Sequence, residues 1–135
     1  MIEIALLISL FMLKHFVADV LLQSNYMGIG KGMEEGWVAP LSQHAFVHSI
    51  GTFLVCFVFL ITGLSFWMAT VLGGIWAIFD FICHFMIDRT KSNPFGLGRH
   101  KDNKPKWIIL SIVDQLFHFA CDGFLIWRLH DKLPN

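Results

Sequence analysis

Four apolar runs, each about long enough to cross a bilayer, constrain the fold of this chain more than any other feature. They cover residues 2–22, 41–63, 65–87 and 107–127. A helix of about 20 residues spans the ~30 Å hydrocarbon core of a membrane. The sequence therefore predicts an all-α, integral-membrane four-helix bundle that forms a single transmembrane domain over residues 1–135.

The connections between the runs set their relative directions. Thr62-Gly63-Leu64-Ser65 predicts a tight turn, so the second and third helices should be antiparallel. Longer polar connections over 25–40 and 89–106 join the other runs, and the first of these has room for a short surface helix. The composition agrees with a membrane protein, because 56% of the residues are hydrophobic and only 15% are charged.

Histidine and aspartate recur at a spacing of four residues inside these apolar runs. On a helix, residues i and i+4 lie on the same face, so each such set forms a polar stripe. The stripes are Asp80/His84/Asp88, His15/Asp19, His44/His48 and Asp114/His118/Asp122.

Alternating helix directions bring the four stripes to the same side of the membrane. Counted at about 1.5 Å per residue from the nearest helix end, eight of the side chains fall within one leaflet. By the same count Asp88 lies at the rim, and Asp122 lies deeper than the rest. The eight candidate ligands are His15, Asp19, His44, His48, Asp80, His84, Asp114 and His118.

Ionisable residues within a span cost about 2.5–3.5 kcal/mol each on insertion scales and usually mark function. Imidazole and carboxylate together suit Zn²⁺, Mn²⁺ or Fe, and helix bundles hold two-metal sites with similar ligands. Eight ligands exceed the needs of one tetrahedral ion, so the pattern predicts a divalent metal and has room for two. Asp80 or Asp114 could instead act as a general base. A single stripe fits equally well a hydrogen-bonded His/Asp pair between helices.

Several other polar side chains are expected to support the site or to lie outside it. Lys14 would either snorkel or pair with an aspartate, and His100 and His130 are predicted to be solvated. Asp88 also fits a simple ion pair with Arg89 at the rim. The residues expected to orient the ligands through hydrogen bonds are Gln23, Gln115, Asp122 and Asp88.

Most basic residues lie in the 89–106 connection. The positive-inside tendency therefore predicts that the stripes face the cytoplasm and that both termini face outside. This tendency explains the basic charge without a further purpose, but the same residues also suit a rim that attracts phosphate. The residues of this predicted phosphate rim are Arg89, Lys91, Arg99 and Lys101.

The combined motifs resemble a small integral-membrane family of bacteria and their phages, a domain of unknown function. The residues that carry the resemblance are His15-Phe16-Val17-Ala18-Asp19 with Leu22-Gln23, His44-x-x-x-His48, His84-x-x-x-Asp88-Arg89-x-Lys91 and Asp114-Gln115-x-x-His118. The resemblance implies a helical protein of the inner membrane and no particular activity. The clustering of His and Asp at helix ends is more distantly similar to the membrane-bound metal-dependent hydrolases of bacteria.

These observations favour a membrane-embedded, metal-dependent hydrolase that acts on a phosphoester of a lipid or a lipid-linked molecule. Two alternatives stay open: a non-enzymatic metal or haem binder, and a small membrane modulator whose stripes only hold the helices together. A homo-oligomer that completes the packing fits all three. The chain has no GxSxG, P-loop or HExxH motif, and its basic residues lack the interleaved aromatics of nucleic-acid binding.

Overall fold

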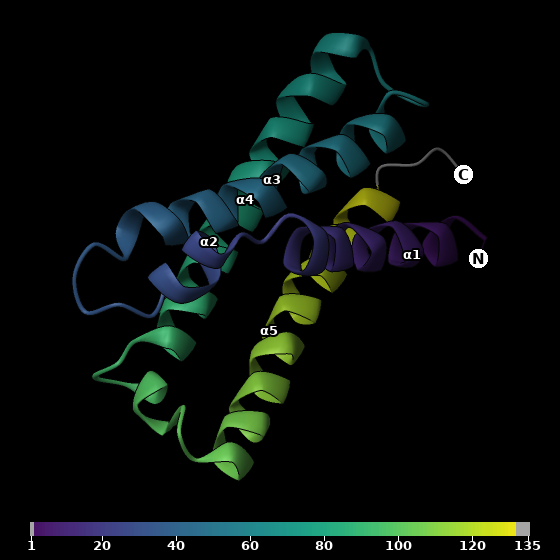
Figure 1. The fold of residues 1–135 in the computed structure, drawn as a ribbon. Helices are drawn as coiled ribbons and strands as arrows, with labels where there is room; N and C mark the ends of the chain where they lie inside the picture. The colour runs from purple at the N-terminus through teal and green to yellow at the C-terminus, as the bar shows by residue number, and fades with distance from the viewer. Residues whose placement is uncertain (1, 132–135) are drawn as a thin grey trace.

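The computed structural model describes residues 2–131, and these form helices joined by turns and short loops. Four segments are long and apolar enough to cross a membrane, namely α1 with the turn that continues it, α3, α4 and α5. This confirms the predicted all-α architecture (Figure 1). The elements are α1 (Ile2–Phe16), the π-helical turn η1 (Val17–Leu21), α2 (Asn25–Gly30), α3 (Val38–Leu60), α4 (Phe66–Ser92), the 3₁₀ turn η2 (Leu97–His100) and α5 (Lys104–His130).

The helices begin at side chains that cap their first turn. The Oγ of Ser24 accepts a hydrogen bond from the Met27 N–H at the start of α2, and the Oγ of Ser65 does the same for Met68 at the start of α4. The side chain of Asn103 caps α5, and Pro105 follows in its first turn. These are the residue types that satisfy free N–H groups at a helix start.

Three helices extend beyond their predicted spans: α3 begins at Val38 and not at residue 41, and α4 and α5 show that polar residues do not end a helix by themselves. α4 continues past Ile87 to Ser92, so Arg89 and Lys91 lie in its last turn. The helix ends at Asn93, whose ψ of 116° is the extended conformation favoured before a proline. α5 begins at Lys104 instead of Trp107, because the Asn103 cap and not the first apolar residue sets its start.

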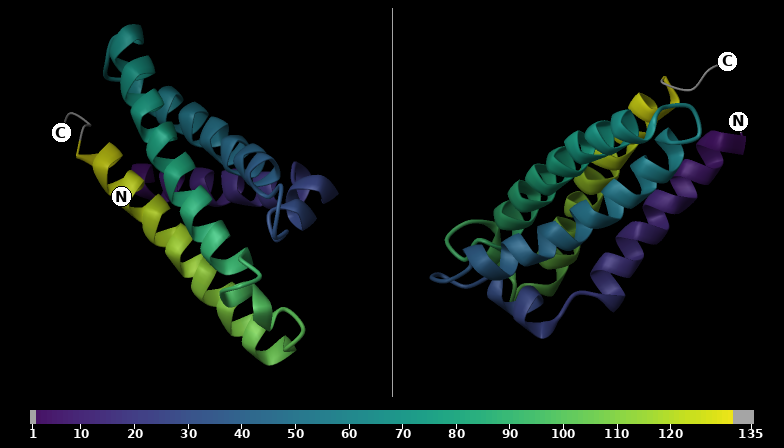
Figure 2. Two further views of the ribbon diagram at one scale, coloured as in Figure 1. Left: turned by 90° about the vertical axis from the view of Figure 1, so that its left-hand side faces the viewer. Right: turned by 90° about the horizontal axis from the view of Figure 1, so that it is seen from above.

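Successive long helices run in opposite directions. The two long connections, α1–α3 and α4–α5, lie at one end of the bundle, and the short α3–α4 turn lies at the other. Figures 1 and 2 show the start of α1, the end of α5 and the α3–α4 turn at one end of the bundle, and α2 and η2 at the other. α3 and α4 pack along their length, α5 lies beside α4 near η2 and diverges from it further on, and α1 packs against α3 and α5. The polar halves of the four spans therefore meet near α2 and η2.

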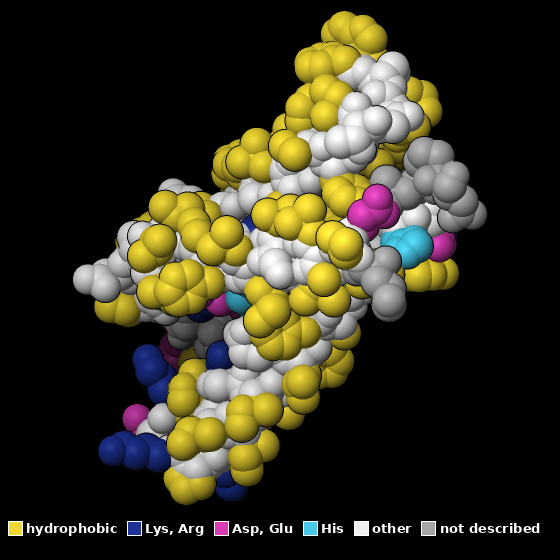
Figure 3. Space-filling model, turned by 90° about the vertical axis from the view of Figure 1, so that its right-hand side faces the viewer, with side chains coloured by type: hydrophobic (Ala, Val, Ile, Leu, Met, Phe, Trp, Pro, Cys, Tyr) yellow, Lys and Arg dark blue, Asp and Glu magenta, His cyan; other side chains and the backbone are white. Residues whose placement is uncertain are grey.

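An apolar core fills the half of the bundle that lies away from α2 and η2. Its buried side chains come from all four long helices and include Leu7, Phe11, Cys56, Ala69 and Leu125. Figure 3 shows hydrophobic side chains over most of the face drawn there, with Lys and Arg gathered at the end near η2 and polar atoms recessed between the hydrophobic ones. The apolar exterior fits the lipid environment that the spans require.

The connection that follows α2 is held firmly against the end of α4. The Arg89 guanidinium donates to the main-chain oxygens of Lys31 and Met33, both at 3.3 Å, and lies 3.8 Å from the ring of Trp37. The Ser92 hydroxyl donates to the Lys31 carbonyl at 2.9 Å. These contacts fix the position from which the Lys31 side chain reaches into the bundle.

Candidate metal centre

The polar stripes of the four spans meet in one buried cluster between the apolar core and the α2/η2 end. His44, His48, His84 and His118 are at most 2% exposed, and Asp80 is fully buried. The structure brings together all eight predicted ligands through direct contacts between neighbouring side chains; their role as ligands stays a prediction. The connecting contacts are His15–Asp19, His44–Asp19, His48–Asp19, His84–Asp80, His118–Asp114 and the ring contacts of His15 with His48, His84 and His118.

Imidazole rings pack against one another at the centre of this cluster. The His84 ring stacks between those of His48, at a centroid distance of 3.9 Å, and His118, at 4.3 Å. The His15 ring lies 4.9 Å from His48 and 5.3 Å from His118. Four imidazoles from four different helices thus share one small volume.

Each of the three stacked histidines has one ring nitrogen paired with an aspartate residue and one without a partner. His48 Nε2 lies 3.1 Å from Asp19 Oδ1, and His118 Nε2 lies 3.2 Å from Asp88 Oδ1. His84 Nδ1 lies 3.2 Å from the main-chain oxygen of Asp80. The other nitrogens, His48 Nδ1, His118 Nδ1 and His84 Nε2, are buried without a hydrogen bond. Metal-binding histidines in proteins show this arrangement, with one nitrogen oriented by a carboxylate or carbonyl and the other facing the metal.

His15 has the largest deficit of hydrogen bonds in the cluster. Its Nε2 lies 3.1 Å from Asp19 Oδ2 and its Nδ1 lies 3.8 Å from Asp122 Oδ2. Neither nitrogen is aligned for a hydrogen bond with a protein group. Because buried polar atoms are almost always paired, this side chain in particular fits a ligand from outside the chain.

Three sets of side chains in the described part of the chain are close enough to hold a metal ion. The sets are His15/His48/His84, Asp19/His44/His48 and Asp88/Asp114/His118, and within each set the ligand atoms lie within 4.8 Å of one another. The first and second share His48, but the third shares no residue with either. Their imidazole and carboxylate groups are donors that suit Zn²⁺, Mn²⁺ or Fe.

Lys14 lies on the side of the cluster that faces the apolar core. Its Nζ is 3.2 Å from Asp80 Oδ1, 3.2 Å from Asp122 Oδ1 and 3.0 Å from Thr52 Oγ1. The side chain does not snorkel to the interface but pairs with aspartates, one of the two roles expected from the sequence. It has this course because α3 carries Gly51 beside the lysine stem, and a Cβ there would lie 2.5 Å from Lys14 Cγ.

Replacing Gly51 by alanine is expected to lower the free energy of unfolding by about 1–3 kcal/mol, the usual cost of overpacking. The reason is that the new methyl group overlaps the Lys14 stem, whose far end is held by three partners. The matched control is Gly74→Ala in α4, where an added Cβ meets nothing within 4 Å. Denaturant unfolding in detergent measures both variants, and equal stabilities would contradict the close approach of Lys14 to α3.

Asp88 lies inside the cluster, and its predicted place at the rim is wrong. It is only 5% exposed, and its carboxylate oxygens contact His118 at 3.2 Å, His44 at 3.1 Å and Lys31 at 2.8 Å. The predicted span ended at Ile87, whereas α4 continues to Ser92, so Asp88 still lies on the inward face of the helix. The two oxygens contact His44 and His118, which belong to different sets of candidate ligands.

The cluster carries more negative than positive charge. Its aspartates are Asp19, Asp80, Asp88, Asp114 and Asp122, and the ammonium groups that pair with four of them belong to Lys14, Lys31 and Lys91. With neutral imidazoles, five carboxylates against three ammonium groups leave an excess of two negative charges. Uncompensated charge is costly in a buried site, and one divalent cation would balance it.

A cavity of about 450 Å³ at the α2/η2 end of the bundle reaches the cluster at Asp88. Asp88 lies on its wall, together with the basic side chains of Lys31, Lys91, Arg99 and Lys101. Three members of the predicted phosphate rim therefore line this entrance. Arg89 lines a different hollow beside Trp37, where it holds the connection that follows α2.

The residues expected to orient the ligands contact the cluster in different ways. Gln115 Nε2 donates to Asp114 Oδ2 at 3.4 Å, and Asp122 contacts Lys14 and His15. Gln23 meets the cluster only through Lys31, whose Nζ donates to its side-chain oxygen at 3.5 Å.

Sequence reasoning missed two contributors to the cluster, Thr52 and Lys31. Thr52 is fully buried and lies four residues after His48, so it continues the His44/His48 stripe, a signal that was present in the sequence. Lys31 reaches Asp88 from the connection after α2, and no spacing rule marks it.

The family described as "Protein of unknown function (DUF3307)" matches residues 6–128. The chain belongs to this family. No curated protein and no solved structure matches the chain.

The DUF3307 match contains the whole cluster, from Lys14 to Asp122. It agrees with the expected family of unknown function, while the bacterial or phage origin stays a prediction. The description of the DUF3307 family states no activity.

Proposed function

We propose that this chain is a membrane-embedded, metal-dependent hydrolase that cleaves phosphoesters of lipids or lipid-linked molecules. The observation that carries the proposal is the set of buried, unpaired imidazole nitrogens beside a carboxylate-rich wall with an excess of negative charge. A cavity with a basic lining leads to this wall. A divalent cation at such a site polarises a phosphoryl group and makes water nucleophilic at neutral pH.

The side chains around the cluster supply the remaining parts of a hydrolysis. Lys31, Lys91, Arg99 and Lys101 line the entrance and would hold the negative charge of a phosphate group. Water adds to phosphorus, the bond to the alcohol oxygen breaks, and a proton moves from the water to a carboxylate and then to the leaving alcohol. Asp114 is better placed for this proton than Asp80, because Asp80 is fully buried and paired with Lys14.

The cluster also has candidate ligand atoms for a second ion. Asp88 contacts His44 with one oxygen and His118 with the other, and these histidines belong to different metal sets. Two ions held by these side chains would supply stabilisation of both the attacking and the leaving oxygen of a phosphoryl transfer. We further propose that the α2/η2 end faces the cytoplasm, because Lys and Arg gather there.

Phosphate release from purified protein tests the enzymatic part of this proposal. The protein is stripped with a chelator, supplied with Zn²⁺ or Mn²⁺, and incubated with phosphatidic acid in mixed micelles. We expect phosphate release only with metal, and a loss of at least about a hundredfold in Asp114→Asn. A protein that binds metal stoichiometrically but releases no phosphate from lipid phosphates would contradict the hydrolase and favour a non-enzymatic metal binder.

The alternatives from the sequence have less support. Haem needs space for its porphyrin plane beside its axial ligands. The His84 ring fills that space, because it stacks directly on the rings of His48 and His118. The Lys14–Asp80–Asp122 contacts do favour a structural role for that part of the cluster, but they leave the unpaired imidazoles unexplained.

A further inference from the structure

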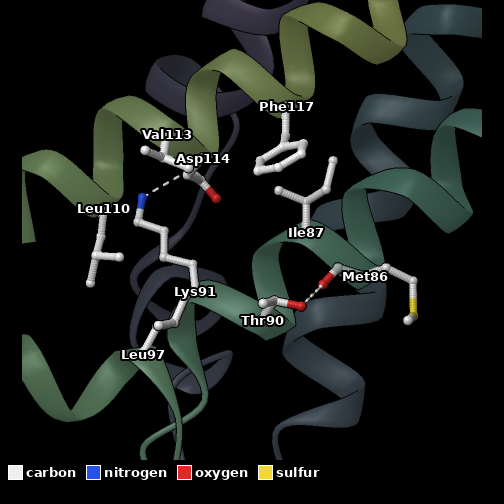
Figure 4. A pocket seen from close by; sticks show the side chains of 9 residues that line it. All are labelled: Met86, Ile87, Thr90, Lys91, Leu97, Leu110, Val113, Asp114 and Phe117. Atoms are coloured by element: carbon white, nitrogen blue, oxygen red, sulfur yellow. Dashed lines mark hydrogen bonds and ion pairs between the residues drawn. The ribbon is translucent and has the colours of Figure 1, made fainter.

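An apolar hollow of about 240 Å³ lies between α4 and α5, near η2. Figure 4 shows Met86 and Ile87 of α4 on one side and Leu110, Val113 and Phe117 of α5 on the other. The Lys91–Asp114 ion pair, with Nζ and Oδ2 2.9 Å apart, lies among these apolar side chains (Figure 4). We call this hollow, with Lys91 and Asp114 in its wall, the α4–α5 groove.

The α4–α5 groove faces the lipid. Both helices are membrane spans by length and composition, and the side chains on its walls are exposed, with Met86 at 61%, Phe117 at 59% and Val113 at 42%. α4 and α5 diverge beyond η2, so the groove opens sideways between the two helices. An apolar molecule could therefore enter it from the bilayer without crossing water.

Lys91 connects the α4–α5 groove with the entrance cavity. Its side chain lines both, and Asp114, which it pairs with, belongs to one of the metal sets. A ligand with an apolar chain in the groove would therefore have a polar head at Lys91, beside the metal set. The neighbouring cavity is lined by Lys31, Lys91, Arg99 and Lys101 against Asp88 and Asp102, and this excess of positive charge matches an anionic head and not a neutral one.

We propose that the α4–α5 groove binds an acyl chain of a phosphate-bearing membrane lipid and that Lys91 holds its phosphate next to Asp114. The proposal names the substrate class of the hydrolase and in that sense rests on the proposed function. Lys91 acts here as a positioning residue, and lateral entry explains how a substrate with long acyl chains reaches a site buried within the bundle. The membrane lipids that fit are those with a phosphate monoester or diester and at least one acyl chain.

Lipid retention tests the groove independently of any activity. Purified protein is mixed with phosphatidic acid or with diacylglycerol in detergent, and bound lipid is counted by native mass spectrometry. Val113→Trp fills the groove, whereas the neighbouring Ile112, 56% exposed, is outside it, so Ile112→Trp is the matched control. We expect Val113→Trp and Lys91→Met each to weaken phosphatidic acid retention about tenfold, Ile112→Trp to leave it unchanged, and Lys91→Met to leave any diacylglycerol retention unchanged.

The proposal fails if Val113→Trp and Ile112→Trp retain equal amounts of phosphatidic acid. It also fails if Val113→Trp changes the oligomeric state and not lipid retention, because a second copy would then occupy the groove. Where the wild type hydrolyses lipid phosphates, Val113→Trp should lower kcat/KM for phosphatidic acid about tenfold and spare a soluble phosphate monoester. If phosphatidic acid retention follows these expectations but the protein has no activity, the hydrolase proposal is contradicted and the lipid-binding proposal stands.

Discussion

Replacing Lys14 by methionine is expected to lower the free energy of unfolding of the metal-free protein by about 3–5 kcal/mol, the usual cost of breaking a buried ion pair. The effect is large because this ammonium group pairs with two carboxylates. Asp80 is fully buried and the Asp122 side chain is 6% exposed, so both would lose their ammonium partner and keep, among the described residues, only histidine contacts. Denaturant unfolding in detergent with a chelator present measures the loss.

Two further variants make the Lys14 result interpretable. Lys106→Met removes an exposed lysine at the start of α5 and should change stability by less than about 0.5 kcal/mol. Adding Asp80→Asn and Asp122→Asn to Lys14→Met removes the unpaired charges. The triple variant should therefore recover a large part of the lost free energy of unfolding. A Lys14→Met protein as stable as Lys106→Met would show that the ammonium group does not neutralise these aspartates.

Replacing His84 by phenylalanine is expected to weaken metal binding by about a hundredfold or more while the bundle stays folded. Phenylalanine keeps a ring between His48 and His118 but has no nitrogen to offer a metal. The metal-free variant loses one hydrogen bond to Asp80 and also removes the unpaired Nε2. Its metal-free stability should therefore lie within about 1.5 kcal/mol of the wild type.

The difference between metal-loaded and metal-free stability separates a ligand from a packing residue. Metal at a hundredfold excess over Kd should stabilise the wild type by about 2.7 kcal/mol and stabilise His84→Phe much less. His100→Ala is the control, because His100 lies in η2 at the same end of the bundle but outside the cluster. If His84→Phe kept the full metal-dependent stabilisation, His84 would not be a ligand.

Periodicity was sufficient to predict that the histidines and aspartates of the four stripes meet. The spacing of His44/His48 and of Asp80/His84 places each pair on one helix face, and the alternating spans then fix which ends come together. These rules depend only on helix geometry and the thickness of the bilayer, so they transfer directly from sequence to structure. The apolar length of each run likewise determined the four-helix architecture.

The same rules do not predict contacts that depend on how neighbouring segments pack. A span that ends at the last apolar residue puts Asp88 at the rim, but the helix continues to Ser92. Lys31 reaches the cluster only because Arg89 and Ser92 hold the preceding connection against α4. The inward course of Lys14 depends on the absence of a side chain at Gly51 on another helix. Such contacts follow from packing, and no local spacing encodes them.

Elemental analysis of the detergent-purified protein tests the metal centre most directly. We expect one or two divalent ions per chain and a Tm that falls when a chelator removes them. Both properties should be lost in His84→Phe and kept in His100→Ala. A wild-type protein without stoichiometric metal, whose Tm does not respond to metal or chelator, would show instead that the histidines and aspartates only hold the helices together.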